Sequence, residues 1–227
     1  KLDITFNQLK LFPQLHFFEN LQVLNLSGNK LTRISAFVGK LPKLKELIVI
    51  GNEVSSVSTY LNQCTSLEKL DLSNNKIRFI PDLSKLENLD EINISGNELS
   101  SLPSGLCQMN YLASIDASGN KLNNLPDELC SCKKLVELNV STNQIPKLPE
   151  EFGNLTRLCS LYLADNKLKD LPLSMGTVPL NYIDISRNPI ENQKLLEKWK
   201  IGTDHLRAYL ELRQDLEAGS NSVSKML

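Results

Sequence analysis

Cysteines, histidines and carboxylates are the residues of this chain whose side chains could hold a metal or catalyse a reaction. Five cysteines occur, two of them in the run Cys130-Ser131-Cys132, and the histidines are His16 and His205. A structural zinc site needs several cysteine or histidine ligands, which usually come as close pairs. The chain has no second cysteine pair, so we expect neither a metal nor a cofactor.

Paired carboxylates could perform general acid–base chemistry, but only in a pocket that shields them from water. Pairs such as Glu91 and Asp116 do occur, and similar pairs recur all along the chain. The Ser-Gly-Asn triplets at Gly28, Gly96 and Gly119 recur in the same way, which indicates repeated turns rather than a phosphate-binding loop. We therefore expect no enzymatic activity.

Asparagine recurs along the chain at a nearly constant interval. Consecutive members are 22 or 23 residues apart, and the apolar residues around them keep the same phase. A fixed period in this range predicts a solenoid, in which each unit contacts its neighbours and adds to one continuous core. The series is Asn7, Asn29, Asn52, Asn75, Asn97, Asn120, Asn143, Asn166 and Asn188.

The fullest units follow the pattern LxxLxLxxNxLxxLPxxLxxLxx. Around Ile115 and Ala117 apolar and polar residues alternate, which predicts a short strand. Strands of successive units would stack about 4.8 Å apart, so nine would form a parallel sheet roughly 40 Å long. Proline fixes φ and lacks an N–H donor, so the in-phase prolines predict an irregular or 3₁₀ return segment. They are Pro81, Pro103, Pro126, Pro149 and Pro172.

The asparagines follow the predicted strands, where the chain turns. An asparagine amide both donates and accepts hydrogen bonds, so it can satisfy backbone groups that a buried turn would leave unpaired. We therefore interpret the series from Asn29 to Asn188 as a structural ladder.

These features resemble the leucine-rich repeat family over residues 1 to about 190. The 23-residue unit with its Leu-Pro step is similar to the intracellular type found in the Ras suppressor protein, Erbin, Scribble and plant intracellular Ras-group repeat proteins. The resemblance implies an α/β solenoid: a horseshoe with a parallel sheet on its concave face and a 3₁₀ or irregular convex side. It also implies binding of a protein by the concave face, without catalysis. Small GTPases, GTPase effectors and phosphatases are the partner classes that it suggests.

The repeat pattern, about nine units with the first one partial, ends near residue 190. Residues 191–217 predict two helices, the first with Leu195 and Trp199 on one face and the second with Thr203 as its N-cap. We expect this segment to cover the last apolar layer as a C-terminal cap. The alternative is a partner-binding helix or the start of a linker. Residues 218–227 are small and polar, which predicts a flexible tail.

The residues on either side of the buried strand positions should point to the concave face. Over these positions and the turn residues before the ladder asparagines, eight acids and three bases give a net charge of -5, against -1 for the whole chain. The acids are Asp3, Glu46, Asp71, Glu91, Asp116, Glu137, Asp165 and Asp184, and the bases are Lys1, Lys69 and Arg187.

This count predicts an acidic groove for a basic or mixed-charge surface of a protein partner. Tyr162 and Tyr182 would act as aromatic anchors near its C-terminal end, because tyrosine is favoured at binding hot spots. The alternative is a solvated face whose charges keep an exposed sheet soluble. The predicted contact residues are Asp71, Glu91, Asn93, Asp116, Glu137, Tyr162, Tyr182, Asp184 and Arg187.

The small net charge argues against a general attraction to nucleic acid or anionic membranes. No apolar stretch approaches the roughly 18 residues of a membrane span. An odd number of cysteines, some at core positions, favours a cytoplasmic protein over a secreted recognition protein. We expect a scaffold or adaptor in intracellular signalling or cytoskeletal regulation. The alternative, suggested by a start within a repeat, is a regulatory or targeting domain of a larger kinase, phosphatase, cyclase or Roc-type GTPase.

Overall fold

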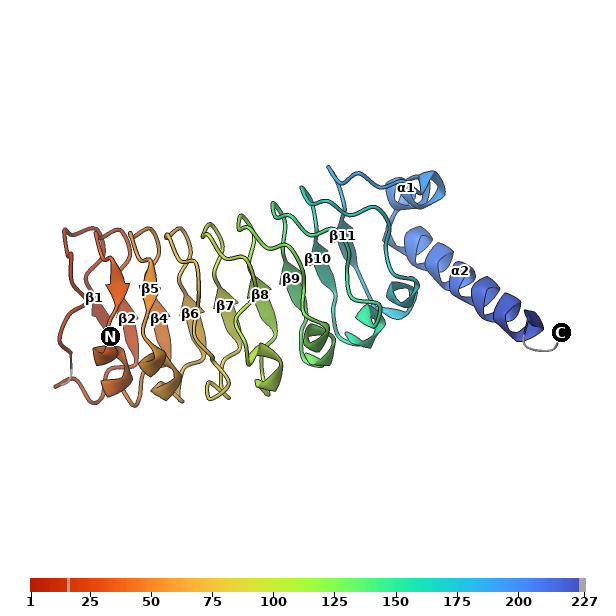
Figure 1. Ribbon diagram of the computed structural model, residues 1–227. Helices are drawn as coiled ribbons and strands as arrows, with labels where there is room; N and C mark the ends of the chain where they lie inside the picture. Colours follow the sequence, from red (N-terminus) through yellow and green to blue (C-terminus); the bar gives the residue numbers. More distant parts are fainter. Residues whose placement is uncertain (16, 225–227) are drawn as a thin grey trace.

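The computed structural model describes residues 1–15 and 17–224, so His16 lies outside the described part. A parallel sheet of nine strands runs along the repeat region, and each strand pairs with the equivalent strand of the next repeat (Figure 1). The strands are β1 (Leu2–Asp3), β2 (Val23–Asn25), β4 (Glu46–Ile48), β6 (Lys69–Asp71), β7 (Glu91–Asn93), β8 (Ser114–Asp116), β9 (Glu137–Asn139), β10 (Ser160–Tyr162) and β11 (Tyr182–Asp184). This arrangement confirms the predicted solenoid.

Short 3₁₀ helices form a second row along the solenoid, below the strands in Figure 1. Pro126 and Pro172 immediately precede two of them, as the proline pattern predicted. Two repeats have serine at this position instead of proline. There the side chains of Ser35 and Ser58 cap the 3₁₀ helix by accepting a hydrogen bond from an N–H group of its first turn. The helices are η1 (Ala36–Lys40), η2 (Thr59–Gln63), η3 (Leu106–Gln108), η4 (Asp127–Ser131), η5 (Phe152–Asn154) and η6 (Leu173–Thr177).

A second, two-stranded sheet joins β3 (Arg33–Ile34) to β5 (Ser56–Val57), and the sequence did not predict it. The Ser58 N–H donates to the Ile34 carbonyl at 3.0 Å. In the next repeat Pro81 occupies the position of Ser58 and has no N–H to donate. The extra sheet therefore stops where the prolines begin.

Each asparagine of the ladder from Asn29 to Asn188 bonds its own repeat to the preceding one. The side-chain nitrogen of Asn120 donates to Ala117 at 3.1 Å and Ser118 at 3.2 Å within its turn, and to Ile94 of the preceding repeat at 3.0 Å. Its oxygen accepts from the Leu99 N–H at 3.0 Å. The equivalent four bonds recur at the other seven positions.

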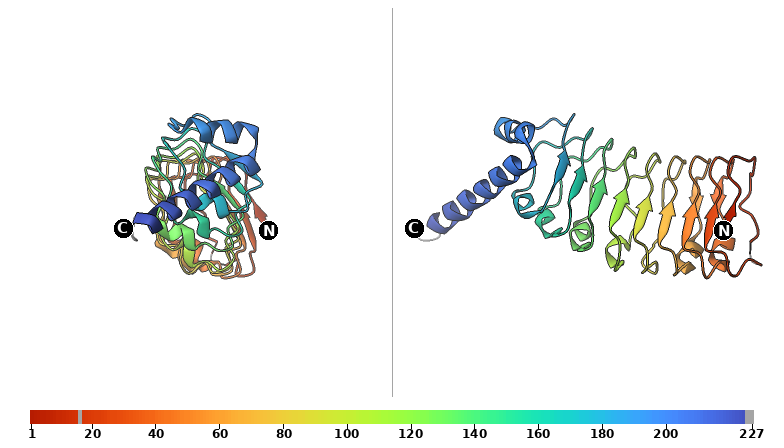
Figure 2. Two further views of the ribbon diagram at one scale, coloured as in Figure 1. Left: turned by 90° about the vertical axis from the view of Figure 1, so that its right-hand side faces the viewer. Right: turned by 180° about the vertical axis from the view of Figure 1, so that it is seen from behind.

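Two helices close the C-terminal end of the solenoid: α1 (Gln193–Ile201) and α2 (Thr203–Ser224). Leu195, Leu206 and Leu210 are buried, and the indole N–H of Trp199 donates to the Ile183 carbonyl at 3.0 Å. The first turns of α2 pack on η6, whereas its far end extends away from the repeats (Figure 2). In the described part of the chain, neither of these helices has the length and apolar character of a membrane span.

The predicted flexible tail begins inside α2, because this helix continues beyond position 218 to Ser224. Adding a residue to an existing helix costs less than starting a new helix, because each added residue gains one backbone hydrogen bond. The small and polar residues after position 218 can therefore continue the helix that residues 203–217 have already formed. Residues 225–227 of the predicted tail lie outside the described residues.

The ladder gives a first prediction. We expect Asn120→Ala to lower the free energy of unfolding by about 1–3 kcal/mol, because the buried Leu99 N–H loses its acceptor and the Ile94 and Ala117 carbonyls each lose one of their two asparagine donors. Urea unfolding followed by circular dichroism would measure the change. The control is Asn123→Ala, an exposed asparagine three residues away, for which we expect a change within about 0.5 kcal/mol. Equal losses in both variants would contradict the role of the ladder.

Candidate protein-binding face

Parallel pairing aligns the first and last residues of each three-residue strand into two columns along the sheet. The middle residue, such as Leu70 or Ile115, is fully buried, so the two columns point away from the core onto the concave face. The first-position column is Val23, Glu46, Lys69, Glu91, Ser114, Glu137, Ser160 and Tyr182. The last-position column is Asp3, Asn25, Ile48, Asp71, Asn93, Asp116, Asn139, Tyr162 and Asp184. Eight of the nine predicted contact residues lie in these columns, and Arg187 lies in the turn after β11.

The acidic and amide side chains of the last-position column fold back onto the turn that follows their strand. One carboxylate oxygen of Asp116 accepts from the Ser118 N–H at 2.9 Å and from the Ser118 hydroxyl at 2.7 Å. The same bond to the N–H two residues ahead forms at Asp71, Asn93 and Asp184. These four residues therefore hold the turn together, a role that the sequence analysis missed. The available signal was the serine two residues after each of them, which is typical of a side-chain-capped turn.

The second oxygen of these carboxylates faces the neighbouring strand. Asp71 accepts from the Asn93 side chain at 3.4 Å, and Asp116 accepts from the Asn139 side chain at 3.3 Å. Asp71 is only 7 % exposed, so it contributes negative charge more than contact area. Asn93 thus lies between Asp71 and Asp116, so the two negative charges are not on adjacent strands.

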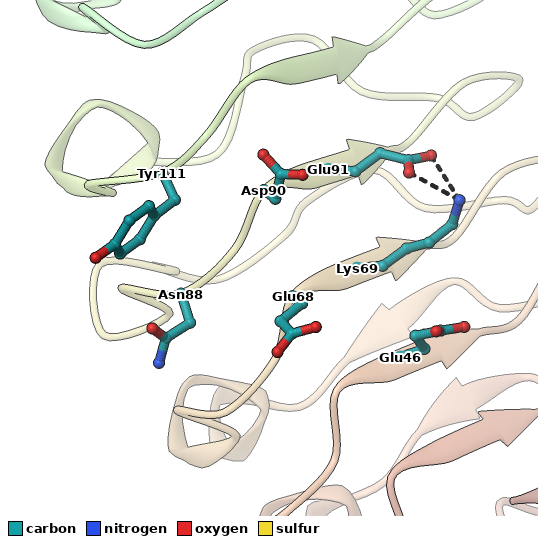
Figure 3. Close-up of a pocket in the computed structure, with 7 residues that line it drawn as sticks. All are labelled: Glu46, Glu68, Lys69, Asn88, Asp90, Glu91 and Tyr111. Atoms are coloured by element: carbon teal, nitrogen blue, oxygen red, sulfur yellow. Dashed lines mark hydrogen bonds and ion pairs between the residues drawn. The ribbon is translucent and has the colours of Figure 1, made fainter.

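Lys69 is the one base among the acids of the first-position column. Its Nζ lies 2.8 Å from both carboxylate oxygens of Glu91 (Figure 3). The hydrogen bond to Glu91, aided by the charges of Glu91, Asp71 and Glu46, raises the pKa of Lys69 above its ordinary value. Lys69 therefore stays protonated and neutralises part of the acidic face. Both side chains are more than a third exposed, so the ion pair itself contributes little to stability.

The acidic surface continues beyond the strands into an open hollow of about 450 Å³ beside β4, β6 and β7. Figure 3 shows Tyr111 and Asn88 on its loop side and the strand residues opposite them. Glu68, Asp90 and Tyr111 were not among the predicted contact residues, because they precede the strands and fall outside the two columns. The hollow is lined by Glu46, Glu68, Lys69, Asn88, Asp90, Glu91 and Tyr111.

Near the C-terminal end the concave face is aromatic. The rings of Tyr162 and Tyr182 lie diagonally across β10 and β11, with centroids 5.1 Å apart and planes tilted by 43°. Tyr182 is 47 % exposed, and Tyr162 is half-buried. In the adjoining turns Arg187 forms an ion pair with Asp165 at 3.1 Å, so the charge there is mixed rather than acidic.

Residues 19–62 and 65–106 match the family model for two copies of leucine-rich repeats, and residues 134–155 match the model for a single leucine-rich repeat. The chain is a leucine-rich repeat solenoid. Leucine-rich repeat domains generally bind other proteins, and we found no catalytic arrangement on the described part of this face.

Solved structures share the leucine-rich repeat fold. A leucine-rich repeat protein of Leptospira interrogans superposes with a TM-score of 0.69 at 28% identity, over 88% of this chain and 57% of that chain. The plant peptide hormone receptor RGFR1 in complex with RGF2 gives a TM-score of 0.69 at 32% identity, over 77% and 29% of the two chains. The functional domain of InlJ from Listeria monocytogenes gives 0.73 at 25% identity, over 84% and 40%.

Two curated proteins are similar within the repeats. An adenylate cyclase of Schizosaccharomyces pombe is 35% identical over 101 residues, which are 44% of this chain and 6% of the cyclase. Ras guanine nucleotide exchange factor V of Dictyostelium discoideum is 31% identical over 106 residues, which are 40% of this chain and 5% of the exchange factor. The leucine-rich repeat chain therefore spans a small part of either relative.

The last-position column gives a second prediction. We expect Asp116→Ala to lower the free energy of unfolding by about 0.5–1.5 kcal/mol, because the Ser118 N–H loses its acceptor. Asp116→Asn should be nearly neutral, since Asn93 makes the same bond in the neighbouring strand. Thermal and urea unfolding of both variants would measure this difference. If asparagine were as destabilising as alanine, the negative charge rather than the turn bond would be the important feature.

Proposed function

We propose that the concave face binds a protein partner with a basic or mixed-charge surface. The chain would then act as a scaffold or adaptor in intracellular signalling or cytoskeletal regulation. The observation that carries the proposal is the contact between the rings of Tyr162 and Tyr182, with Tyr182 47 % exposed, at the end of a column that contains Asp71 and Asp116. Tyrosine offers a large contact area and a hydrogen bond at low entropic cost, which suits the centre of an interface.

The two columns would contribute differently to this interface. The last-position side chains are held by turn bonds, so their charges are fixed in place before a partner arrives. Preorganised charge increases the association rate of a complementary partner and selects against a wrong one. The first-position residue Glu137 is exposed and lies between the acidic strands and the tyrosines. It would therefore link the electrostatic and aromatic parts of the face.

Small GTPases, GTPase effectors and phosphatases are the partner classes that we propose. Similarity to a protein named as a Ras guanine nucleotide exchange factor favours a partner linked to small GTPases. The resemblance to the intracellular type of repeat supports a cytoplasmic location.

A second candidate function is a regulatory or targeting domain within a larger signalling protein. Its support is that the aligned segments form 6% and 5% of an adenylate cyclase and a Ras exchange factor. The complete coding sequence tests this candidate. A catalytic domain in the same reading frame is the expected result, and a full-length protein made of repeats and cap alone would exclude it.

The binding proposal can be tested with a photo-crosslinking residue at Ser160, which lies on the concave face between Glu137 and Tyr182. We expect it to capture a partner, and the captured partner would then be titrated against concave-face variants. Tyr182→Ala should weaken the affinity by about tenfold, or about 1.4 kcal/mol. Combined Asp71→Asn, Glu91→Gln, Asp116→Asn and Glu137→Gln should reduce both the association rate and its salt dependence, while the asparagines keep the turns intact.

Two controls distinguish the face from the rest of the surface. The same photo-crosslinker at exposed Lys147, which lies outside both columns, should not capture this partner. Lys69→Gln should strengthen binding of a basic partner, because it leaves Glu91 and its neighbours uncompensated. Capture from Lys147 alone, or unchanged affinity in the tyrosine and charge variants, would refute the proposal.

A further inference from the structure

Two cysteine thiols of neighbouring repeats meet on the convex side of the solenoid. Cys107 lies in η3, and Cys132 directly follows η4. Their Sγ atoms are 3.0 Å apart, with Cys132 as the donor. Other cysteines of the repeats have backbone partners instead: Cys64 donates to the Val38 carbonyl at 3.2 Å, and Cys159 to the Arg157 carbonyl at 3.3 Å. The thiol pair is therefore specific to these two repeats.

We propose that Cys107 and Cys132 form a reversible intramolecular disulfide when the reduced protein meets a hydroperoxide. A disulfide brings two sulfurs to about 2.0 Å, so an approach of about 1 Å converts the contact into a bond. Intracellular disulfides of this kind are usually transient and redox-sensing.

The two thiols have different surroundings, which assigns their roles. Cys107 lines an open hollow of about 560 Å³ between η3 and η4, so a small oxidant can reach it. Cys132 is 6% exposed and lies behind it. The hydrogen bond from Cys132 lowers the pKa of Cys107, against the opposing effects of burial and Glu128, and the same bond raises the pKa of Cys132. Cys107 is thus the attacking thiolate, and Cys132 resolves the product.

The reaction balances with hydrogen peroxide as the oxidant. The Cys107 thiolate attacks one peroxide oxygen, an S–O bond forms, the O–O bond breaks, and the departing hydroxide takes a proton to become water. Cys132 then attacks the Cys107 sulfur: the S–S bond forms, the S–O bond breaks, and a second water leaves with the Cys132 proton. Two electrons pass from the thiols to the peroxide. A dithiol reductant reverses the bond by thiol–disulfide exchange.

Cys130 is the competing partner for Cys107. It is buried, and burial is the main cause that raises its pKa to about 11. It follows Leu129 as Cys107 follows Leu106, so the two cysteines hold equivalent positions in adjacent repeats. The Sγ contact of Cys107, however, is made with Cys132 rather than with Cys130.

The repeat supplies conservative replacements for each cysteine. Ser84 occupies the position equivalent to Cys107 and Cys130, and Val178 the position equivalent to Cys132. Cys107→Ser, Cys130→Ser and Cys132→Val therefore place at each site a side chain that the same position holds in another repeat. Circular dichroism before oxidation would confirm that all three variants fold.

The experiment treats the reduced full chain with hydrogen peroxide, blocks the remaining thiols by alkylation and analyses the protein by mass spectrometry. Before alkylation, we expect the intact mass to fall by two hydrogens and to return after reduction with dithiothreitol. Trypsin cleaves after Lys121, which separates Cys107 from Cys132. The link should then join two peptides, and fragmentation should place it on Cys132 rather than Cys130.

The variants decide the assignment. The link should persist in Cys130→Ser and disappear in Cys107→Ser and Cys132→Val, and in Cys132→Val the oxidised Cys107 should accumulate as sulfenic acid. Oxidation should raise the thermal unfolding midpoint of the unsubstituted chain but not that of Cys107→Ser. A link that persists in Cys132→Val, or no link in the unsubstituted chain, would overturn the proposal.

Discussion

The hydrogen bonds of the ladder asparagines are the constraint on which the rest of the structure depends. A solenoid turns inward at every repeat, and each turn buries carbonyl groups that have no strand or helix partner of their own. One asparagine amide satisfies three carbonyls and one N–H, and it spans two repeats while doing so. The same bonds form across repeats of 22 and of 23 residues, so they fix each turn against the preceding one while the return segment varies by one residue. Strand register, and with it the alignment of the two columns, follows from these bonds between successive turns.

The same constraint divides the concave face into two kinds of position. The last residue of each strand lies next to the turn, so a short acidic or amide side chain there bonds the turn backbone first. The first residue lies away from the turn and is not needed for it, which leaves Glu137 and Tyr182 available to a partner. Tyr162 is informative because it occupies a last position without an oxygen that can cap the turn. This repeat lacks the hydrogen bond from the strand's last side chain to the turn backbone, and it presents an aromatic ring on the concave face instead.

Repetition decides how much could be predicted from the sequence. The sheet, the 3₁₀ row and the helical cap were predicted correctly. The apolar pattern recurs in about nine repeats, so one departure or one chance match does not change the predicted fold. The turn role of Asp116 was missed, since the pattern shows which face a side chain lies on but not whether its oxygen bonds its own backbone or water. The extra sheet around Ile34 was missed because it depends on the N–H of Ser58, at a position where the next repeat has proline. The contact between Cys107 and Cys132 is diagonal and joins inequivalent positions, so no periodic pattern contains it.

The two sides of the solenoid therefore differ in how much variation they tolerate. On the sheet side every strand has the same register, so residues can be exchanged only within fixed columns. On the convex side the return segments are tied to the repeat less strictly: η3 has three residues and η4 has five. That irregularity allows two thiols to meet between these helices, outside both columns of the concave face. A modification there would act on the coupling between neighbouring repeats and leave the side chains of the concave face chemically unchanged, so that binding and its regulation can occupy opposite sides of one frame.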